Sequence, residues 1–148
     1  MTIVRPVAER DKTAWSRLWV DYGIFYKEQF GPEITDSVWA WLLDPSHEIE
    51  GIVTVDDADN VIGFALYREH ADTFTAGRAL YLDDLFVDPA ARGAGAGALL
   101  LAELAVIAAN RGARVIRWIT AEDNATARRL YDRVATKATW VTYEMAAR

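Results

Sequence analysis

The sequence predicts a mixed α/β fold in which a central sheet carries helices on both of its faces. Apolar residues make up 52% of the 148 residues, enough to fill a sizeable core. Segments rich in β-branched residues alternate with segments in which apolar residues recur at helical spacing. One strand–helix–strand unit spans residues 79–120, and such a unit joins parallel strands by a right-handed crossover.

Length and composition predict one domain, residues 1–148, without disulfides or a metal site. Chains of this size usually fold as a single domain. The sequence has no cysteine and two histidines, which excludes a thiolate metal site and a covalent cysteine intermediate. The net charge of −6 argues against nucleic acid as a partner, because proteins that bind the phosphates of DNA are normally basic.

A cytoplasmic protein without a membrane partner is expected. The N-terminus has no apolar run before its first charged residues, so no secretory signal is predicted. The longest apolar stretch, residues 98–109, is too short for a bilayer span, which takes about 20 residues.

The first half of the chain predicts two helices and three strands. Trp15, Leu18 and Tyr22 recur at helical spacing and define one apolar face. An aromatic segment bounded by glycine and proline follows and separates this helix from the next. The predicted elements are a strand (2–6), a helix from residue 8, a helix (35–43) and two strands (49–56 and 61–70).

The second half predicts an alternation of strands and helices. Pro89 ends a strong strand, and a glycine-rich stretch then opens an Ala/Leu helix. Gly112 occupies the position of a helix C-cap. The predicted elements are a strand (79–87), a helix from the glycines to about residue 111, a strand (115–120), a helix (124–134) and a last strand (139–145).

The glycine-rich stretch is the strongest chemical signal. Backbone N–H groups at a helix N-terminus are unpaired, and the helix dipole favours anions there. Glycines let the backbone approach a phosphate closely, and Arg92 adds a forked cationic donor. A plain strand–helix turn is the structural alternative. A P-loop is excluded because no Lys-Ser or Lys-Thr follows the glycines, and the single parallel unit argues against a dinucleotide fold.

Two motifs together resemble the GNAT superfamily of acetyl-CoA-dependent N-acetyltransferases. Residues 92–97 (RGAGAG) are similar to its pyrophosphate loop, and the preceding LFVDP at 85–89 also fits. Asn124, Ala127, Leu130 and Tyr131 match the family's N-x-x-A-x-x-[L/F]-Y helix. The resemblance covers about residues 79–145, and Val134–Lys137 departs from the Gly-Phe that many relatives carry.

The resemblance implies acetyl-CoA as the donor, no metal, and a mixed, mostly antiparallel sheet of about six to seven strands. It also implies that backbone groups of the strand before the loop hold the pantetheine arm. The YLDDLFV segment at 81–87 is similar to the diamine acetyltransferases, and the C-terminal part to the histone-and-polyamine group. The cofactor-binding residues expected on this basis are Leu85, Phe86, Val87, Arg92, Gly93, Ala94, Gly95, Ala96, Gly97 and Asn124.

Tyr131 is the candidate general acid. It lies seven residues after Asn124, so both side chains share one face of a helix. A phenol aimed at the sulfur could protonate the departing thiolate, which is the role that the resemblance favours. The alternatives are a core aromatic at Tyr131 and a simple N-cap at Asn124.

Asp83 and Asp84 are adjacent carboxylates in the middle of a strand. Regular alternation places them on opposite faces unless a bulge intervenes. We expect Asp84 to anchor a cationic amine and Asp83 to act as a water-linked base, while the alternative is that one simply faces solvent. Aromatic faces attract ammonium groups, so the expected acceptor pocket, unless these residues are only core, consists of Tyr22, Phe25, Tyr26 and Trp118.

The sequence therefore predicts an enzyme that moves an acetyl group from acetyl-CoA to a primary amine of a small cationic substrate, a polyamine, diamine or amino-acid-like molecule. Direct attack in a ternary complex is the expected mechanism. The alternatives are an acetyltransferase of protein lysines or N-termini and a non-catalytic module that binds acetyl-CoA. The oligomeric state that we consider for this enzyme is a homodimer.

Overall fold

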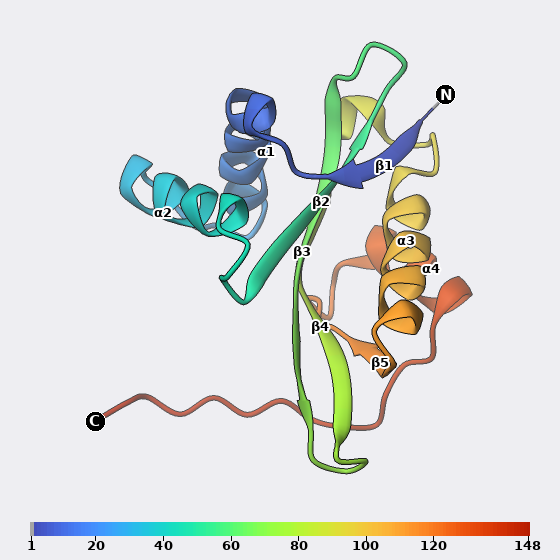
Figure 1. Cartoon of the computed structure of the whole chain (residues 1–148). Helices are drawn as coiled ribbons and strands as arrows, with labels where there is room; N and C mark the ends of the chain where they lie inside the picture. The colour runs from blue at the N-terminus through green and yellow to red at the C-terminus, as the bar shows by residue number, and fades with distance from the viewer. Residues whose placement is uncertain (1) are drawn as a thin grey trace.

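A computed structural model describes residues 2–148, and its centre is a five-stranded sheet in the order β1-β2-β3-β4-β5 (Figure 1). The first four strands are antiparallel to their neighbours, and β5 is parallel to β4. This confirms the mixed, mostly antiparallel sheet. The strands are β1 (Ile3–Pro6), β2 (Ile49–Val55), β3 (Val61–Asp72), β4 (Gly77–Val87) and β5 (Ala113–Arg117).

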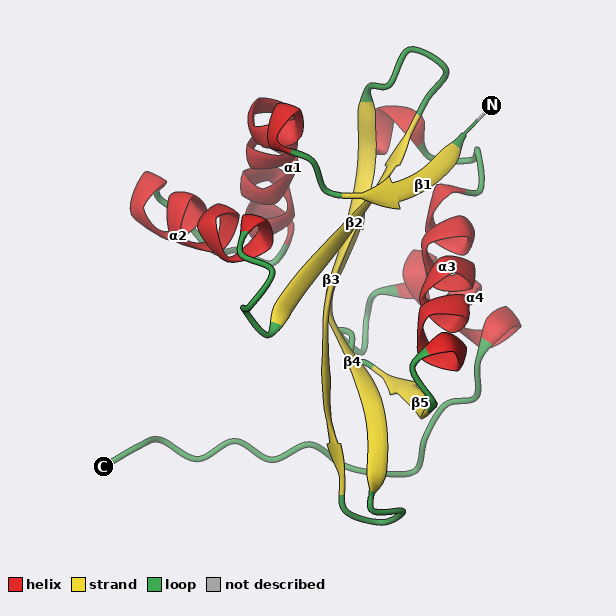
Figure 2. Ribbon diagram, in the orientation of Figure 1, coloured by secondary structure: helices red, strands yellow, loops and turns green. Residues whose placement is uncertain are grey.

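Helices cover both faces of the sheet, as the sequence predicts (Figure 2). α1 (Lys12–Phe25) and α2 (Pro32–Leu43) lie on one face, and α3 (Ala96–Asn110) and α4 (Ala125–Val134) lie on the other. Short 3-10 turns, η1 (Glu9–Asp11) and η2 (Pro89–Ala91), precede α1 and the glycine loop. No helix among residues 2–148 is long and apolar enough to cross a membrane.

The face beneath α1 holds an aromatic core. Trp15 and Leu18 are fully buried at helical spacing on α1, and Phe64 of β3 meets them from the sheet. The Trp15 and Trp19 rings stack with their centroids 5.4 Å apart. Each buried aromatic contributes a large apolar area, so this face forms a rigid base for the side chains beside it.

The face beneath α3 holds an aliphatic core. Leu100 and Leu104 of α3 are fully buried and pack on Leu80 and Leu82 of β4. Gly112, after the end of α3, has a φ of +70°, which matches the predicted C-cap.

The far edge of the sheet is only partly paired. β5 pairs with β4 at Arg78, Leu80 and Tyr81, and the strands then separate. Among residues 2–148, the β4 edge from Leu82 to Val87 has no strand on the β5 side. Its backbone groups on that side are therefore available to a ligand.

The predicted last strand at 139–145 is not formed, and the sheet has five strands rather than six to seven. Residues 135–148 contain neither helix nor strand. The segment runs away from the sheet in an extended course to the C-terminus (Figure 1). A strand exists only when a second strand pairs with it, and within this chain the segment meets none.

Candidate active site

The glycine loop connects β4 to α3 in the predicted way. Gly93 and Gly95 have φ values of +94° and +77°, and a Cβ at either would meet no atom within 4 Å. Glycine is therefore required by backbone conformation rather than by local crowding. The open space in front of the loop is available to an anion.

The backbone N–H groups of this loop are free. The first N–H group of α3 that has an acceptor is that of Leu99, which donates to the Gly95 carbonyl at 3.0 Å. Among residues 2–148, no acceptor faces the preceding N–H groups of residues 93–98. A turn of unpaired donors at a helix N-terminus forms a phosphate site.

Two further residues define the edges of this loop. The Arg92 side chain is exposed, and its guanidinium carbon lies 6.0 Å from the centroid of the Phe86 ring. A Cβ at Gly97 would lie 3.0 Å from a methyl of Leu130. Gly97 therefore lets α3 and α4 approach, whereas Arg92 is free to bind.

A β-bulge places both adjacent carboxylates on the α1 face. Leu66 of β3 lies opposite Asp84, but the next residue, Tyr67, lies opposite Leu82. Asp83 is the extra residue of the bulge, so the alternation slips by one position there. Its carboxylate meets Arg68, which shares the face of Leu66. Regular alternation would have separated the two carboxylates.

Asp84 is partly buried and held by a tyrosine. The Tyr22 hydroxyl donates a hydrogen bond of 2.7 Å to its Oδ1. Burial raises the pKa of Asp84 to about 6, the Tyr22 hydrogen bond opposes this, and the charge of Asp83 adds to it. A carboxylate with a pKa near neutrality is suited to accept a proton from an acceptor amine.

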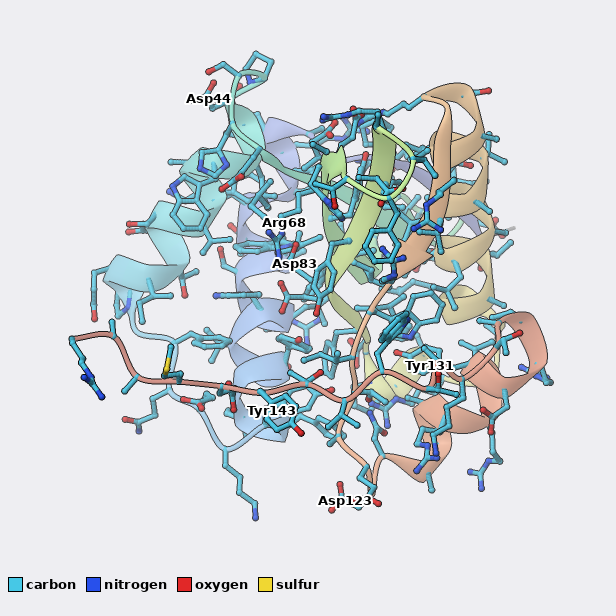
Figure 3. The ribbon with its side chains drawn as sticks, turned by 90° about the horizontal axis from the view of Figure 1, so that it is seen from below. Asp44, Arg68, Asp83, Asp123, Tyr131 and Tyr143 are labelled. Carbon is cyan, nitrogen blue, oxygen red and sulfur yellow. The ribbon has the colours of Figure 1, made fainter. Side chains whose placement is uncertain are left out.

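Asp83 is paired with a cation that sequence reasoning did not single out. Arg68 Nε donates to its carboxylate at 3.1 Å, and the guanidinium carbon lies 4.9 Å from the centroid of the Tyr81 ring. Burial nevertheless raises the pKa of Asp83, against the effect of Arg68. Figure 3 shows Arg68 and Asp83 pointing toward one another. The only possible sequence signal for Arg68 is its place in a predicted strand.

Tyr131 lies on the other side of the β4–β5 separation. Its ring meets Trp118 edge to face, with centroids 5.3 Å apart. Burial raises the pKa of Tyr131 to about 12, and Tyr26 adds to this effect, so the phenol stays protonated at neutral pH. Among residues 2–148, its hydroxyl has no hydrogen-bond partner and is free to donate a proton.

Asn124 is the N-cap residue of α4, and its carbonyl accepts a hydrogen bond from Arg128 N at 3.0 Å. Its side chain makes no capping hydrogen bond to the helix, and its Nδ2 instead donates to Thr120 Oγ1 at 3.0 Å. This bond ties the start of α4 to the segment after β5. Asn124 therefore occupies the N-cap position, as the alternative has it, but without a side-chain cap, and its predicted cofactor contact stays a prediction.

The predicted aromatic residues occupy two places. Tyr22 bonds to Asp84 from the last turns of α1, and Tyr26 meets the Tyr22 ring edge to face, with ring centroids 5.1 Å apart. Phe25 is half exposed and touches the edge of Tyr26. Trp118 lies with Tyr131 instead. We call Tyr22, Asp83 and Asp84 the acidic side, and Trp118 and Tyr131 the α4 side.

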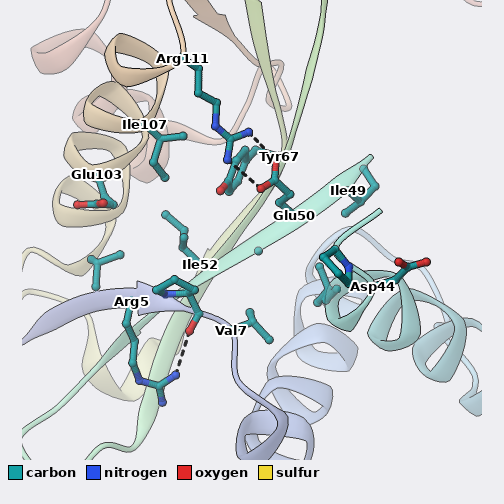
Figure 4. A pocket seen from close by; sticks show the side chains of 15 residues that line it. Arg5, Val7, Asp44, Ile49, Glu50, Ile52, Tyr67, Glu103, Ile107 and Arg111 are labelled. Carbon is teal, nitrogen blue, oxygen red and sulfur yellow. Dashed lines mark hydrogen bonds and ion pairs between the residues drawn. The ribbon is translucent and has the colours of Figure 1, made fainter. Parts of the chain in front are cut away.

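A separate hollow of about 410 Å³ lies between β1, β2 and α3 (Figure 4). Arg111 there binds Glu50 through two hydrogen bonds of 2.7 and 2.9 Å. None of the predicted site residues lines this hollow. Residues 2–148 contain no group of three side chains that could hold a metal ion.

Free N–H groups at a helix N-terminus suit an anionic donor, and a partly buried carboxylate on the preceding strand suits an amine, so the fold and the site fit the class of transferases that join the two. The chain belongs to the acetyltransferase (GNAT) family, whose model matches residues 13–135. It is an acetyl-transferring enzyme.

Two relatives of known name agree with this family. The chain is 31% identical over 143 residues to D-amino-acid N-acetyltransferase HPA3 of Saccharomyces cerevisiae, covering 96% of this chain and 89% of that protein. Over 71 residues it is 37% identical to the thialysine N-epsilon-acetyltransferase of Mus musculus, covering 48% of this chain and 41% of that one.

Two solved structures share the fold. A ribosomal-protein-alanine N-acetyltransferase of Brucella melitensis superposes with a TM-score of 0.85 at 23% identity, covering 99% of this chain and all of that one. AAC(6')-Iy in complex with a CoA bisubstrate analogue superposes with a TM-score of 0.83 at 17% identity, covering 100% and 99%.

Proposed function

We propose that the enzyme transfers the acetyl group of acetyl-CoA to the primary amine of a small cationic or amino-acid-like acceptor. The observation that carries this proposal is Asp84: a partly buried carboxylate with a pKa of about 6, beside a second carboxylate. The names of two relatives, a D-amino-acid and a thialysine acetyltransferase, support an acceptor of this size. A cytoplasmic location remains a prediction.

The residues present fit acetyl-CoA as the donor. The free N–H groups of residues 93–98 and the exposed Arg92 suit its pyrophosphate. The unpaired edge of β4 at Leu85–Val87 suits the amides of its pantetheine arm, because an extended chain can add to a free strand edge. When bound, acetyl-CoA supplies a thioester that an amine can attack.

The acidic side would receive the acceptor. A carboxylate with a pKa of about 6 is mostly ionised at pH 7 and attracts an ammonium group. Tyr22 holds Asp84 in place through its hydrogen bond, and the neighbouring aromatic rings offer faces to the cation. Asp84 would then accept the proton that the amine must lose before it can attack.

The α4 side would receive the leaving group. The amine nitrogen forms a bond to the carbonyl carbon, the carbon–sulfur bond breaks, and the sulfur takes the proton of the Tyr131 hydroxyl. The raised pKa of Tyr131 means that the phenol carries its proton at neutral pH. The amine loses one proton to Asp84 before it attacks, and its second proton leaves to water once the nitrogen has bonded to the carbonyl carbon. A proton from water then restores the Tyr131 hydroxyl, so the two sides handle opposite proton transfers.

The test is a panel of diamines, polyamines, thialysine and D- and L-amino acids with acetyl-CoA, read by thiol release. We expect turnover of at least one small amine, and a loss of kcat/KM of about tenfold or more in Asp84→Asn, because positioned acid–base groups contribute roughly 10²–10⁴-fold. The control is Asp36→Asn, which removes an exposed carboxylate on α2. Equal rates in both variants would reject the role of Asp84.

A further inference from the structure

The guanidinium group of Arg68 is held at one end and free at the other. Its Nε donates to both oxygens of the Asp83 carboxylate, at 3.1 and 3.3 Å (Figure 3), and its central carbon lies 4.9 Å from the centroid of the Tyr81 ring. Among residues 2–148, no hydrogen-bond acceptor meets either of its terminal nitrogens, Nη1 and Nη2. The Arg68 side chain is 39% exposed, so these donors are open to a ligand.

Two other arginines show how the same group pairs within the fold. Arg5 donates from both terminal nitrogens to Asp11, at 2.8 Å each. Arg111 binds Glu50 in the same forked manner, at 2.7 and 2.9 Å. The fork is the part of a guanidinium that matches the two oxygens of a carboxylate. Arg68 makes its ion pair through Nε alone, which leaves its fork for a second carboxylate.

Arg68 lies on the same face of the sheet as Asp84. Leu66 of β3 is opposite Asp84. Arg68 is two residues further along β3, so it shares the face of Leu66, and it is opposite Tyr81. Burial and the charges of the two adjacent carboxylates raise the pKa of Tyr81, whereas Arg68 lowers it. All three charged groups therefore lie around one ring.

The spacing of Arg68 and Asp84 fits an amine and a carboxylate on one carbon. Diagonal positions on neighbouring strands of one face are about 7–8 Å apart. An α-amino acid covers a comparable distance when its ammonium group and its carboxylate each make a charge-assisted bond of about 2.8 Å.

We propose that Arg68 forms a carboxylate subsite and that the acceptor is an α-amino acid, with its ammonium group on Asp84 and its carboxylate on the free fork of Arg68. The subsite depends on the proposed function, because Asp84 must receive the amine that is acetylated. Positive and negative charges then alternate from Asp83 through Arg68 and the acceptor to Asp84. Both charged groups of the acceptor thus have an opposite charge beside them.

The same guanidinium acts against diamines and polyamines. A second ammonium group in the position of the amino-acid carboxylate would meet the like charge of Arg68. Discrimination between two ligands commonly includes such a repulsive contact. Arg68 therefore narrows the acceptor from small amines in general to those that carry a carboxylate beside the amine.

The test compares two amino acids, each in both hands, with the amines that lack their carboxylate: phenylalanine with phenethylamine, and alanine with ethylamine. Thiol release gives kcat/KM for each compound, and the quantity compared is the ratio of amino acid to amine. We expect Arg68→Gln to lower this ratio by about tenfold or more, the loss expected for a charge-assisted bond. Arg68→Lys keeps the charge but not the fork, and its ratio should lie between those of Arg68→Gln and the wild type.

An unchanged ratio in Arg68→Gln would overturn the subsite, because loss of the Asp83 pair alone affects amino acid and amine alike. Arg78→Gln is the matched control. The Nε of Arg78 also donates to a carboxylate, that of Glu69 at 2.6 Å, but Arg78 is about 20 Å from Asp84 along β4. Its ratio should equal that of the wild type, and an equal fall in both variants would also overturn the subsite.

A binding measurement separates failure of the subsite from failure of the proposed function. Calorimetric titration of the enzyme–CoA complex with the same amino acids needs no turnover, and Arg68→Gln should weaken binding by about tenfold or more. If the wild type acetylates neither amino acids nor amines, the proposed function fails, and this titration still decides the subsite. Absence of binding, or equal affinities in wild type and variant, would overturn it. Turnover of the amines but of no amino acid would overturn the subsite and leave the proposed function standing.

Discussion

The acidic side and the α4 side of the site differ in how they are built. Tyr22 and Asp84 rest on α1, β3 and β4, whose residues Trp15, Leu18 and Phe64 are fully buried. Trp118 and Tyr131 rest on β5 and α4, and no residue after Ala108 is buried. The acceptor groups therefore sit on fully buried aromatic residues, whereas the candidate acid sits on partly buried residues at the margin of the aliphatic core.

Because of this difference, we expect substitutions on the two sides of the site to have different effects on folding and on turnover. Deep burial concentrates folding free energy on the α1 face, because the hydrophobic effect scales with the apolar area removed from water. Substitutions there are expected to unfold the protein before they reveal a catalytic role. Substitutions on the α4 side are expected to alter turnover with little effect on folding.

The largest expected effect is that of Tyr131→Phe on turnover. The change removes only a hydroxyl that has no partner within residues 2–148, so packing on Trp118 is kept. We expect kcat to fall roughly 10²–10⁴-fold, the contribution of a positioned acid, with acetyl-CoA affinity nearly constant. Steady-state kinetics and calorimetry check this, and a variant with more than about half the normal rate would assign Tyr131 to packing.

The next effect compares one tryptophan from each side. Trp15→Ala empties a fully buried site and should cost about 3–5 kcal/mol of unfolding free energy. Trp118→Ala removes a partly buried ring and should cost about 1–2 kcal/mol. Urea denaturation of both variants measures the difference, and equal costs would break the contrast between the two sides.

A smaller effect is expected from a substitution in the glycine loop, the candidate site of the pyrophosphate. Gly95→Val places a β-branched residue at a φ of +77° and a side chain where the anion must approach. We expect acetyl-CoA binding to weaken by about tenfold or more, since one lost charge-assisted contact is worth about 1.5–3 kcal/mol. Calorimetric titration with acetyl-CoA measures it.

Gly112→Val is the matched control for that titration. It imposes the same strain at a φ of +70°, also with open space around the Cβ, but at the opposite end of α3. Both variants should lose similar stability, and only Gly95→Val should lose affinity. Equal affinities would contradict the assignment of the loop to the pyrophosphate.

The smallest effect concerns pH. Asp84 must be ionised to accept a proton, so kcat/KM should fall as the pH drops through its pKa of about 6. The Tyr22 hydrogen bond lowers this pKa and the charge of Asp83 raises it. Tyr22→Phe should therefore move the acidic limb upward and Asp83→Asn should move it downward, each by up to about one pH unit. Shifts in the same direction would show that another group titrates.

The sequence predicts the parts of this molecule that local rules determine. The strand–loop–helix unit, the C-cap at Gly112 and the apolar face of α1 follow from residue spacing and glycine conformation. The start of α2 is less well predicted: the helix begins at Pro32 rather than at Thr35, because proline is favoured in the first turn and Thr35 is buried inside the helix.

The parts that depend on pairing could not be predicted. The bulge at Asp83 arises from the pairing of β4 with β3, and the Asp-Asp pair alone does not predict it. The hydrogen bond from Tyr22 joins residues 62 positions apart, and Arg68 reaches Asp83 only because of the register. The last strand was predicted wrongly for the same reason, since its residues favour a strand but the chain offers no neighbour.

The bulge adds to β4 one residue, Asp83, that has no residue opposite it on β3. Omitting Asp83 would leave Leu82 and Leu85 toward α3, and Asp84 and Phe86 toward α1, as in an unbroken ladder. Omitting Leu85 would instead send Asp84 into the aliphatic core. We therefore expect an in-frame deletion of the Asp83 codon to leave the fold intact, and a deletion of the Leu85 codon, two positions later, to disrupt the core.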